Sequence, residues 1–544
     1  MAFSSEGTAH RSTVTGRRGM VASAHPLASL AGLRILMDGG NAIDAAVATA
    51  AALNVTEPYM SGIAGVGYMH IYSARDDERR ILDYVGLTPA ATRIELYDED
   101  GKKDRGPLSP LVPGACGGWL EALRRYGTMD AAAVFQPAIE YAEQGFALTV
   151  KNAEFFASNL DDLRRYPSST TTYLLDGHAP RPGEVLVQAD LAETLRSVAA
   201  EGPKVMYTGE LGDVIAAFMA ETGGLLTRQD LAAFEPVWLE PVSVEYRGWR
   251  VFAPPPPCQA IQYLETLNIL EEYDLAAMGH NSAEALHHFI EAVKLSVADR
   301  AEYAAIGAPP TAGLLSKEYA TRRRELLGER AAPSGGDVYT VEKMDGEVTA
   351  GDPTAWMRSE CTTHFDTVDA DGNAVAVTQS LGSGFGSAMV VPGTGIALNN
   401  FMRWFDREPA SPNAIGPSKK NEMCVSPTQV WDEAGLRLLI GTPGSYGILQ
   451  TTPQMISNVL DHGMHIQAAI EAPRVKVGRG LHVDVESRIE AAVLSELEQR
   501  GHEIGHLGDW SPTVGGGQGI AVDPDTGSFM GGADPRRDGY ALGW

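Results

Sequence analysis

The stretch CTTHFDTVDADGNAVAVTQS, residues 361–380, decides the fold. Its two halves, 362–369 and 373–380, alternate with a period of two residues and flank the turn sequence Asp-Ala-Asp-Gly at 369–372. Such alternation on both sides of a short Asp/Gly-containing connection is typical of an antiparallel hairpin. We therefore predict two paired strands, the first of which begins at residue 362.

The sequence downstream of this hairpin repeats the design. SPTQVWDEAGLRLLIGTPG, residues 426–444, predicts a second hairpin around 432–435. Helical patterns follow, and the chain closes with glycine-rich strands. Strand hairpins flanked by helices indicate sheets stacked between helical layers. The predicted helical segments are 451–463, 465–473 and 488–501.

The sequence upstream is mainly helical. HPLASLAGLRILMDGG (25–40) predicts a helix stopped by two glycines, and NAIDAAVATAAALNV (41–55) a second helix with Asn41 as N-cap. The segments GYMHIY (67–72) and ILDYVG (81–86) predict strands. Further on, residues 90–110 predict a loop, 114–330 a helix-rich region, and the polar, Gly/Pro-rich residues 330–361 a linker.

Composition excludes several classes of protein. The chain has 544 residues, of which 44% are hydrophobic and 21% charged, so it can build folded cores. Its net charge of −27 argues against nucleic acid as a partner and against binding to anionic membranes, because both need clustered Lys and Arg. We expect neither partner.

The sequence offers no metal motif and no targeting segment. Its four cysteines form no CxxC pair, and its 13 histidines include no HExxH, so we expect no metal and no cofactor. The longest apolar stretch, Ala42 to Val55, is too short to cross a bilayer. The N-terminus lacks the apolar segment of a signal peptide. We expect a cytoplasmic protein.

Thr362 stands where the predicted linker meets the first strand. If the chain were cut between Cys361 and Thr362, Thr362 would carry a hydroxyl nucleophile and a free α-amine. An α-amine titrates near pH ~7.7–8.0, so part of it is neutral and can accept the hydroxyl proton. Threonines at linker-to-strand junctions are common, and this pattern alone leaves a structural threonine open.

A set of motifs that follow one another along the chain favours a nucleophilic Thr362 over a structural one. The chain resembles the γ-glutamyltransferase family of N-terminal-nucleophile hydrolases from about residue 20 to the C-terminus. The motifs are GGNAIDAAVATAAALNVTEPYMSGIAGVGYM, VPGACGGWLEALRRYGTM, the PPP…LETLNILEEYDL…EALHHFIEAVKLSVADR block, TTHFDTVDADGNAVAVTQSLGSGFG, GIALNN, SPTQV and GTPGS.

This resemblance implies an αββα fold and a self-processing precursor. Cleavage before Thr362 would leave associated large (1–361) and small (362–544) subunits, of 361 and 183 residues. Thr362 would attack an amide and form an acyl-enzyme, which water or an amine acceptor resolves. Ser380 matches the family's second hydroxyl, and Gly444 with Ser445 matches the glycine pair whose amides form the oxyanion hole. His364 is expected to be structural.

The positions with which the family binds the γ-glutamyl group depart from its pattern. The family places an arginine, two serines, an asparagine, a glutamine or glutamate and an aspartate there. This chain has Val85, Met423-Cys424, Gly382, Phe401 and Trp404 at the corresponding positions. Burying an unpaired α-carboxylate among such residues would cost several kcal/mol. We therefore expect the acyl-transfer chemistry without glutamate recognition, as in the family's divergent acylase and amidohydrolase members.

The expected substrate pocket includes Asn400, Phe401, Arg403 and Trp404, with Asn399 organising the same loop. The two aromatic residues suggest a larger or more apolar acyl group, or are simply core residues. Arg403 and Asp406 would serve another polar group. Two other hypotheses stay open: a glutathione hydrolase whose specificity residues have moved, and an unprocessed relative that binds a ligand without turnover.

Overall fold

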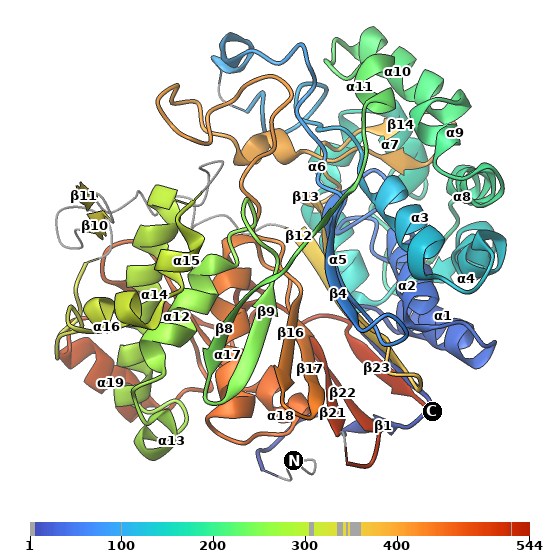
Figure 1. Cartoon of the computed structure of the whole chain (residues 1–544). Helices are drawn as coiled ribbons and strands as arrows, with labels where there is room; N and C mark the ends of the chain where they lie inside the picture. Colours follow the sequence, from blue (N-terminus) through green and yellow to red (C-terminus); the bar gives the residue numbers. More distant parts are fainter. Residues whose placement is uncertain are drawn as a thin grey trace. The chain divides into compact units, whose positions relative to one another are not determined.

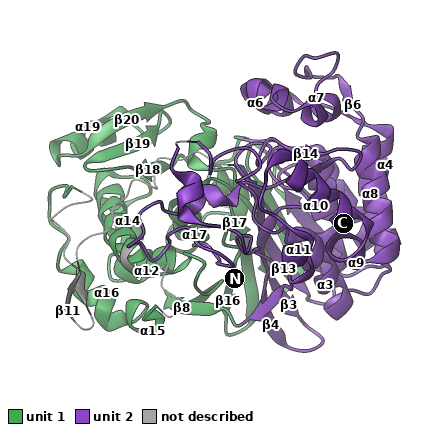
Figure 2. Cartoon of the chain, turned by 90° about the horizontal axis from the view of Figure 1, so that it is seen from above, with its two compact units in different colours: residues 1–15, 240–359, 422–536 green, residues 16–239, 360–421, 537–544 purple. Residues whose placement is uncertain are grey.

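The computed structural model describes residues 6–99, 101–303, 309–333, 341–343, 346–348, 361–523 and 525–544. They form two compact units (Figure 2). Unit 1 comprises residues 1–15, 240–359 and 422–536, and unit 2 comprises 16–239, 360–421 and 537–544. Each unit therefore contains chain from both sides of the Cys361–Thr362 bond. Most of the predicted linker 330–361 lies outside the described residues.

The predicted hairpin at 361–380 is confirmed and lies in the middle of the sheet of unit 2. The sheet has the order β23-β2-β12-β13-β3-β4-β7, and its neighbouring strands pair antiparallel. The strands are β2 (Gly19–Ser23), β3 (Val66–Ser73), β4 (Glu78–Asp83), β7 (Val237–Leu239), β12 (Cys361–Asp369), β13 (Ala374–Gly382) and β23 (Tyr540–Gly543).

Helices cover one side of this sheet (Figure 1). The two predicted N-terminal helices are confirmed as α1 (Pro26–Met37) and α2 (Ala42–Thr56), and α2 packs on β12 and β13. Every residue of α2 is buried, which explains its alanine-rich composition. The remaining helices of unit 2 are α3 (Ala115–Tyr126), α4 (Ala131–Gln144), α5 (Val150–Ser158), α6 (Leu160–Arg164), α7 (Pro167–Tyr173), α8 (Ala189–Glu201), α9 (Lys204–Tyr207), α10 (Glu210–Thr222) and α11 (Arg228–Ala232).

Unit 1 is built around a second sheet of order β1-β22-β21-β17-β16-β9-β8. The predicted hairpin is confirmed as β16 (Thr428–Asp432) and β17 (Gly435–Gly441). The other strands are β1 (Val14–Gly16), β8 (Val242–Tyr246), β9 (Trp249–Ala253), β21 (Gln518–Asp523) and β22 (Ser528–Ala533).

The region 114–330 is helix-rich as predicted, but it also contains strands β8 and β9, which the sequence analysis does not predict. The two strands form a hairpin whose turn residues, Arg247 and Gly248, both have positive φ angles, 55° and 80°. A two-residue turn of this kind matches the twist of antiparallel strands. Arg-Gly is not among the usual sequences for it, so the turn signal is weak.

The helices of unit 1 pack on its sheet and on one another. Helix α12 (Ile261–Leu270) contacts β8, α17 (Ile448–Leu460) contacts β17, and α18 (Ile466–Glu471) contacts β21 and β22. Helix α14 (Ala283–Tyr303) packs on α12. The rest of the unit includes α13 (Leu275–Met278), α15 (Thr311–Leu314), α16 (Lys317–Arg324), α19 (Ala491–Gln499) and a small sheet of β18 (Val475–Val477), β19 (His482–Glu486) and β20 (Glu503–Leu507).

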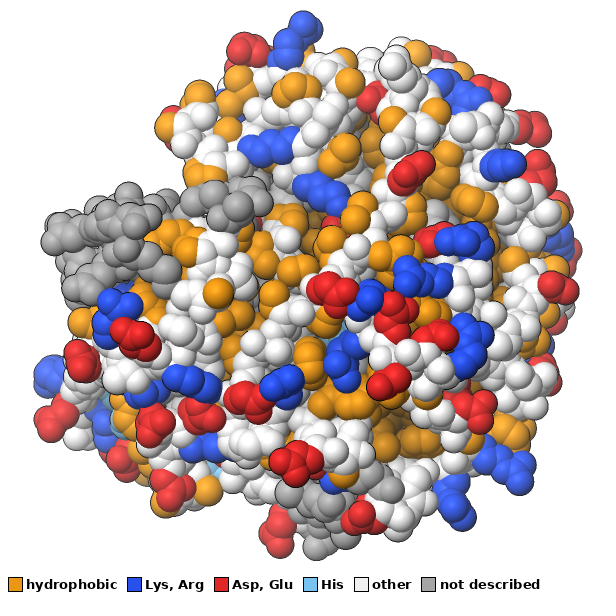
Figure 3. Space-filling view, viewed as in Figure 1, with side chains coloured by type: hydrophobic (Ala, Val, Ile, Leu, Met, Phe, Trp, Pro, Cys, Tyr) orange, Lys and Arg blue, Asp and Glu red, His pale blue; other side chains and the backbone are white. Residues whose placement is uncertain are grey.

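Acidic and basic side chains are interspersed on the face drawn in Figure 3. Among the described residues, none of the helices has the length and apolar character needed to span a bilayer.

The hairpin of unit 2 is tied to α2 by one buried carboxylate. Asp369 Oδ2 accepts hydrogen bonds from the backbone N–H of Ala42 (2.8 Å) and from the side chain of Asn373 (2.8 Å). Asp369 Oδ1 accepts two more from the backbone of the turn, from Asp371 and Asn373 (both 3.0 Å). One side chain therefore holds both the turn and the start of the helix.

We expect Asp369→Ala to lower the free energy of unfolding by about 2–4 kcal/mol, because several hydrogen bonds to a buried charged acceptor are lost. Asp371→Ala is the matched control: it changes an exposed side chain in the same turn and should cost less than about 0.5 kcal/mol. Urea unfolding followed by circular dichroism measures both. Equal, small effects would show that Asp369 does not secure the hairpin.

Candidate active site

Thr362 lies at an irregularity in the pairing of β12 with β13. Cys361 is opposite Gly382, whereas Thr363 is opposite Gln379, so the partner strand has one residue more at this point. A bulge of this kind redirects neighbouring side chains and is common beside active sites. Here it brings the Thr362 Oγ1 within 3.4 Å of the Ser380 Oγ, and both residues are buried.

The Ser380 hydroxyl joins three groups. It accepts from Thr362 and from the backbone N–H of Gly382 (2.8 Å), and it donates to the carbonyl oxygen of Cys361. The carbonyl of the Cys361–Thr362 peptide bond is therefore polarised by the same hydroxyl that contacts the Thr362 oxygen. This arrangement can stabilise negative charge on the carbonyl oxygen while a nucleophile adds to its carbon.

The backbone beside Thr362 is held by residues that the sequence analysis missed. The Arg537 guanidinium donates to the carbonyl of Thr362 (3.3 Å). The Thr363 hydroxyl donates to the Glu57 carboxylate (3.0 Å). Glu57 caps the end of α2, and Arg537 precedes β23, so no local motif links either residue to Thr362. The one signal in the sequence is an acidic residue directly after an alanine-rich helix.

Glu57 has an unusual protonation equilibrium. Burial raises the pKa of Glu57 to about 7, while the charge of Arg537 and the hydrogen bond from Thr363 lower it in part. The nearby Asp538 carboxylate adds to the rise. Glu57 therefore changes charge near neutral pH. It is bonded to Thr363, the residue that follows Thr362 in the chain.

His364 has both ring nitrogens engaged within the sheet, as expected for a structural residue. Nδ1 lies 2.8 Å from the Thr378 hydroxyl and Nε2 lies 3.2 Å from Asp366. Burial raises the pKa of Asp366, and its interaction with His364 opposes that rise.

The loop after β13 places the predicted pocket residues. Asn400 accepts from the Ser383 N–H (2.9 Å) and donates to the Asp104 carbonyl (2.6 Å) and to the Ser383 hydroxyl (3.1 Å). Asn399 bonds both the N–H and the carbonyl of Leu111. In this structure both amides position the loop; contact between Asn400 and a substrate stays a prediction.

Phe401 and Trp404 lie in a short 3₁₀ helix, Phe401–Trp404, with their rings tilted by 33° and their centroids 4.7 Å apart. Both are buried, and Trp404 packs against Gly382. A Cβ added at Gly382 would lie 2.1 Å from the Asn400 Oδ1 and 3.2 Å from the Trp404 ring, and the φ angle of 106° also favours glycine. The absence of a side chain at 382 therefore makes room for Trp404.

Two guanidinium groups lie in the same region of unit 2. Arg403, one of the predicted pocket residues, pairs with Asp104 at 3.6 Å and keeps about a quarter of its side chain exposed (27%). Arg105, which the sequence analysis did not select, pairs with Asp162 (3.1 Å) and donates to the carbonyls of Gly384 and Gly386. Arg403 is the more exposed of the two guanidinium groups, so it is better placed to bind a polar group of another molecule.

Comparisons with known proteins agree with this geometry. Residues 28–544 match the family described as gamma-glutamyltranspeptidase. The chain belongs to the gamma-glutamyltranspeptidase family. An acylase ACY 1 proenzyme from Pseudomonas sp. (strain SE83) is 40% identical over 98% of this chain and 94% of the relative. A glutathione hydrolase proenzyme from Bacillus subtilis (strain 168) is 33% identical over 97% of this chain and 92% of the relative.

The solved structure of a cephalosporin acylase from Bacillus halodurans matches with a TM-score of 0.89 and 35% identity. The match covers 100% of this chain and 99% of that one. The resemblance, the N-terminal-nucleophile hydrolase fold class and the assignment as an enzyme are thereby confirmed at the level of the gamma-glutamyltranspeptidase family.

The family's glycine pair corresponds to Gly444 and Ser445 in unit 1. Gly444 has a φ angle of 133°, which favours glycine, and Ser445 has a positive φ of 57°. Both precede α17, and the first amides of a helix lack intrahelical partners. Their role as oxyanion donors stays a prediction. The positions that replace the family's carboxylate-binding residues, Val85, Met423 and Cys424, are all buried.

Replacing Glu57 by Gln should remove one pH-dependent contribution to stability. In the folded protein Glu57 keeps a proton that the unfolded chain has already released between about pH 4.5 and 7. That contribution is complete below about pH 4.5 and is lost as the pH rises through 7. The free energy of unfolding, relative to Glu57→Gln, should therefore fall by about 2–3 kcal/mol from pH 5 to 8.

Urea unfolding at several pH values measures this difference, with all samples in the same Thr362→Ala background. Glu318→Gln, at an exposed position of α16, is the matched control and should follow the unaltered protein. Parallel curves for the unaltered protein and Glu57→Gln would refute the shifted pKa.

Proposed function

We propose that the chain is a precursor that cleaves itself between Cys361 and Thr362. The observation that carries this proposal is the Ser380 hydroxyl, which contacts the Thr362 oxygen and donates to the Cys361 carbonyl. The names of the two curated relatives, both proenzymes, support it. The products would be subunits of residues 1–361 and 362–544, which stay associated.

The cleavage begins when the Thr362 Oγ1 adds to the carbonyl carbon of Cys361. The Ser380 O–H stabilises the charge that develops on the carbonyl oxygen. The C–N bond then breaks, and the hydroxyl proton of Thr362 passes through Ser380 to the departing nitrogen. The resulting ester joins Cys361 to the Thr362 oxygen. Water hydrolyses it and leaves a Cys361 carboxylate, a free Thr362 hydroxyl and a free α-amine.

The free α-amine of Thr362 then serves as the base for the enzyme's own reaction. With a pKa near ~7.7–8.0, part of it is neutral at physiological pH and can accept the hydroxyl proton. The Thr362 oxygen attacks an amide substrate, the amine of the substrate leaves with that proton, and an acyl-enzyme forms. Water releases the acid, or an amine acceptor takes the acyl group.

The acyl group of the substrate is proposed to be of the acylase type and not γ-glutamyl. Val85, Gly382, Phe401 and Trp404 provide neither a charge nor an amide for an α-carboxylate or α-ammonium group. The tilted rings of Phe401 and Trp404 make this part of the loop apolar. Similarity to an acylase proenzyme and a cephalosporin acylase supports this assignment. Arg403 is proposed to bind a polar end of the acyl chain.

We expect Thr362→Ala to remain a single chain of 544 residues without amidase activity, because the nucleophile is lost. Ser380→Ala should slow cleavage by roughly 100-fold or more, in the range found for loss of an oxyanion donor. Denaturing electrophoresis and N-terminal sequencing measure both, with Thr-Thr-His as the expected new terminus.

Thr367→Ala is the matched control on the same strand: its hydroxyl bonds the Ala42 carbonyl, away from the bond that is cut. It should cleave normally. Efficient cleavage of Thr362→Ala would contradict the nucleophile assignment, and an uncut, inactive unaltered protein would favour the ligand-binding relative.

Three anilides separate the possible acyl groups. Glutaryl is γ-glutamyl without its α-ammonium, and pentanoyl lacks the carboxylate as well. We expect kcat/KM for at least one of these two to exceed that for the γ-glutamyl anilide by about 100-fold, because the ammonium would be buried unpaired. Release of 4-nitroaniline measures the rates. A preference for γ-glutamyl would establish the glutathione hydrolase alternative.

Arg403→Gln tests the polar end of the pocket. It should reduce hydrolysis of the glutaryl anilide and leave the pentanoyl anilide unchanged, because only glutaryl carries a terminal carboxylate. Arg407→Gln, exposed on the same loop, is the matched control and should affect neither substrate. Equal losses for both anilides would remove Arg403 from substrate recognition.

A further inference from the structure

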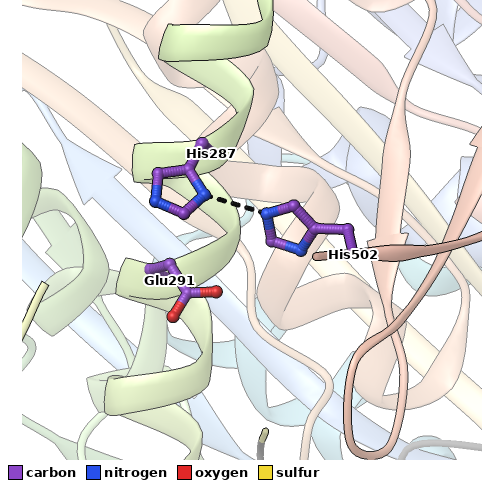
Figure 4. Close-up of side chains that lie close together, drawn as sticks. All are labelled: His287, Glu291 and His502. Atoms are coloured by element: carbon purple, nitrogen blue, oxygen red, sulfur yellow. Dashed lines mark hydrogen bonds between the residues drawn. The ribbon is translucent and has the colours of Figure 1, made fainter. Parts of the chain in front are cut away.

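A second group of chemically capable side chains lies in unit 1: His287, Glu291 and His502 (Figure 4). His287 and Glu291 are four residues apart on α14 and therefore lie on the same face of the helix. His502 comes from the turn between α19 and β20. One side-chain nitrogen or oxygen of each lies within 4.8 Å of the others, and all three residues are buried. Because His502 lies 215 residues after His287, no local sequence motif marks this group.

The hydrogen bond of His287 to the backbone fixes which nitrogen faces the cluster. Its Nε2 lies 2.8 Å from the carbonyl oxygen of Gly328. A carbonyl can only accept, so Nε2 bears the proton and Nδ1 presents a lone pair. That Nδ1 lies 2.9 Å from the Nε2 of His502. A backbone carbonyl behind a histidine is the usual way in which a metal-binding imidazole is oriented.

His502 is incompletely satisfied in this arrangement. Its Nε2 faces His287, and its buried Nδ1 has no hydrogen-bond partner among the described residues. A buried imidazole nitrogen without a partner is costly in a purely structural pair of histidines. A metal at Nε2 would leave this Nδ1 unpaired as well, so the case for a site rests on the proximity of the three ligand atoms.

Glu291 supplies a carboxylate beside the two rings. Its Oε1 accepts from the Lys294 ammonium (2.7 Å), and its Oε2 accepts from the Ala332 N–H (3.2 Å). Lys294 also donates to the Ala332 carbonyl (2.8 Å), so it keeps a partner if a cation takes its place at Glu291. The backbone therefore holds the carboxylate in place, and the carboxylate already pairs with one positively charged group, the Lys294 ammonium.

We propose that His287 Nδ1, His502 Nε2 and a Glu291 carboxylate oxygen bind a divalent metal of the zinc type. Two imidazoles and one carboxylate form a ligand set that zinc accepts, with water as a fourth ligand. Two nitrogens on a tetrahedral zinc lie roughly 3.3 Å apart, given Zn–N bonds of about 2.0–2.1 Å. The rings, now 2.9 Å apart, would separate by a few tenths of an ångström.

The three ligands lie on both sides of the Cys361–Thr362 bond. His287 and Glu291 precede it and His502 follows it. The metal would therefore connect the two subunits of the mature enzyme, a consequence that rests on the proposed cleavage. Binding itself does not, because the ligands are present in the uncut chain as well.

The test measures zinc by mass spectrometry in full-length protein made in zinc-supplemented medium and then desalted. We expect one zinc per chain in the mature protein and in the uncut Thr362→Ala variant, so a failure of cleavage cannot be mistaken for a failure of binding. His502→Ala and Glu291→Gln should weaken binding by more than the roughly 10–100-fold that the loss of an outer-shell partner costs. Chelation should also lower the urea concentration at which the mature subunits separate.

His288→Ala is the matched control on α14: its Nδ1 bonds the Glu284 carbonyl and its ring contacts Tyr273, so zinc should be retained. His462→Ala tests the other close histidine pair, His280 and His462, and should also retain zinc. If His502→Ala does not fold, the visible spectrum of the Co²⁺-loaded unaltered protein decides, with tetrahedral absorption expected. Absence of that spectrum, no zinc in the unaltered protein, or undiminished zinc in His502→Ala would overturn the proposal.

Discussion

The hydrogen bond from the Ser380 hydroxyl to the Cys361 carbonyl is the contact on which the proposed chemistry depends. It exists because β13 has one residue more than β12 opposite Thr362, which turns both hydroxyls toward the same peptide bond. The regular hairpin beyond this point fixes the register, and Asp369 fixes the hairpin to α2. The contacts that stabilise the sheet therefore also set the geometry of the reacting groups.

The position of Thr362 within its sheet explains how a cut chain can stay folded. Cleavage would free the end of β12, but this strand pairs with β13 on one side and β2 on the other. Arg537, from the far end of the sequence, holds the carbonyl of Thr362, and Glu57, from α2, holds the next residue. Glu57 precedes the Cys361–Thr362 bond in the sequence and Arg537 follows it. A new N-terminus at Thr362 would therefore keep partners that do not depend on the linker.

The sequence predicted the parts of the molecule that depend on local pattern. Both central hairpins and the capped helix at Asn41 follow from periodicity and turn residues, and they were found. Strands β8 and β9 were missed because an Arg-Gly turn gives little signal. Glu57, Arg537 and the His287–His502 pair were missed for another reason: their partners lie 175 to 306 residues away, and only the fold brings them together.

The departures from the family's glutamyl-binding pattern are not independent of one another. Gly382 has no side chain, and Trp404 and Asn400 occupy the space that a Cβ would need. Asn400 in turn holds the Ser383 and Asp104 backbone, which sets the path of the loop carrying Arg403. Restoring an asparagine at 382 would therefore displace Trp404 or the loop before it could bind an ammonium group. The proposed acyl specificity is therefore a property of the packed loop, and changing it requires several of these residues to change together.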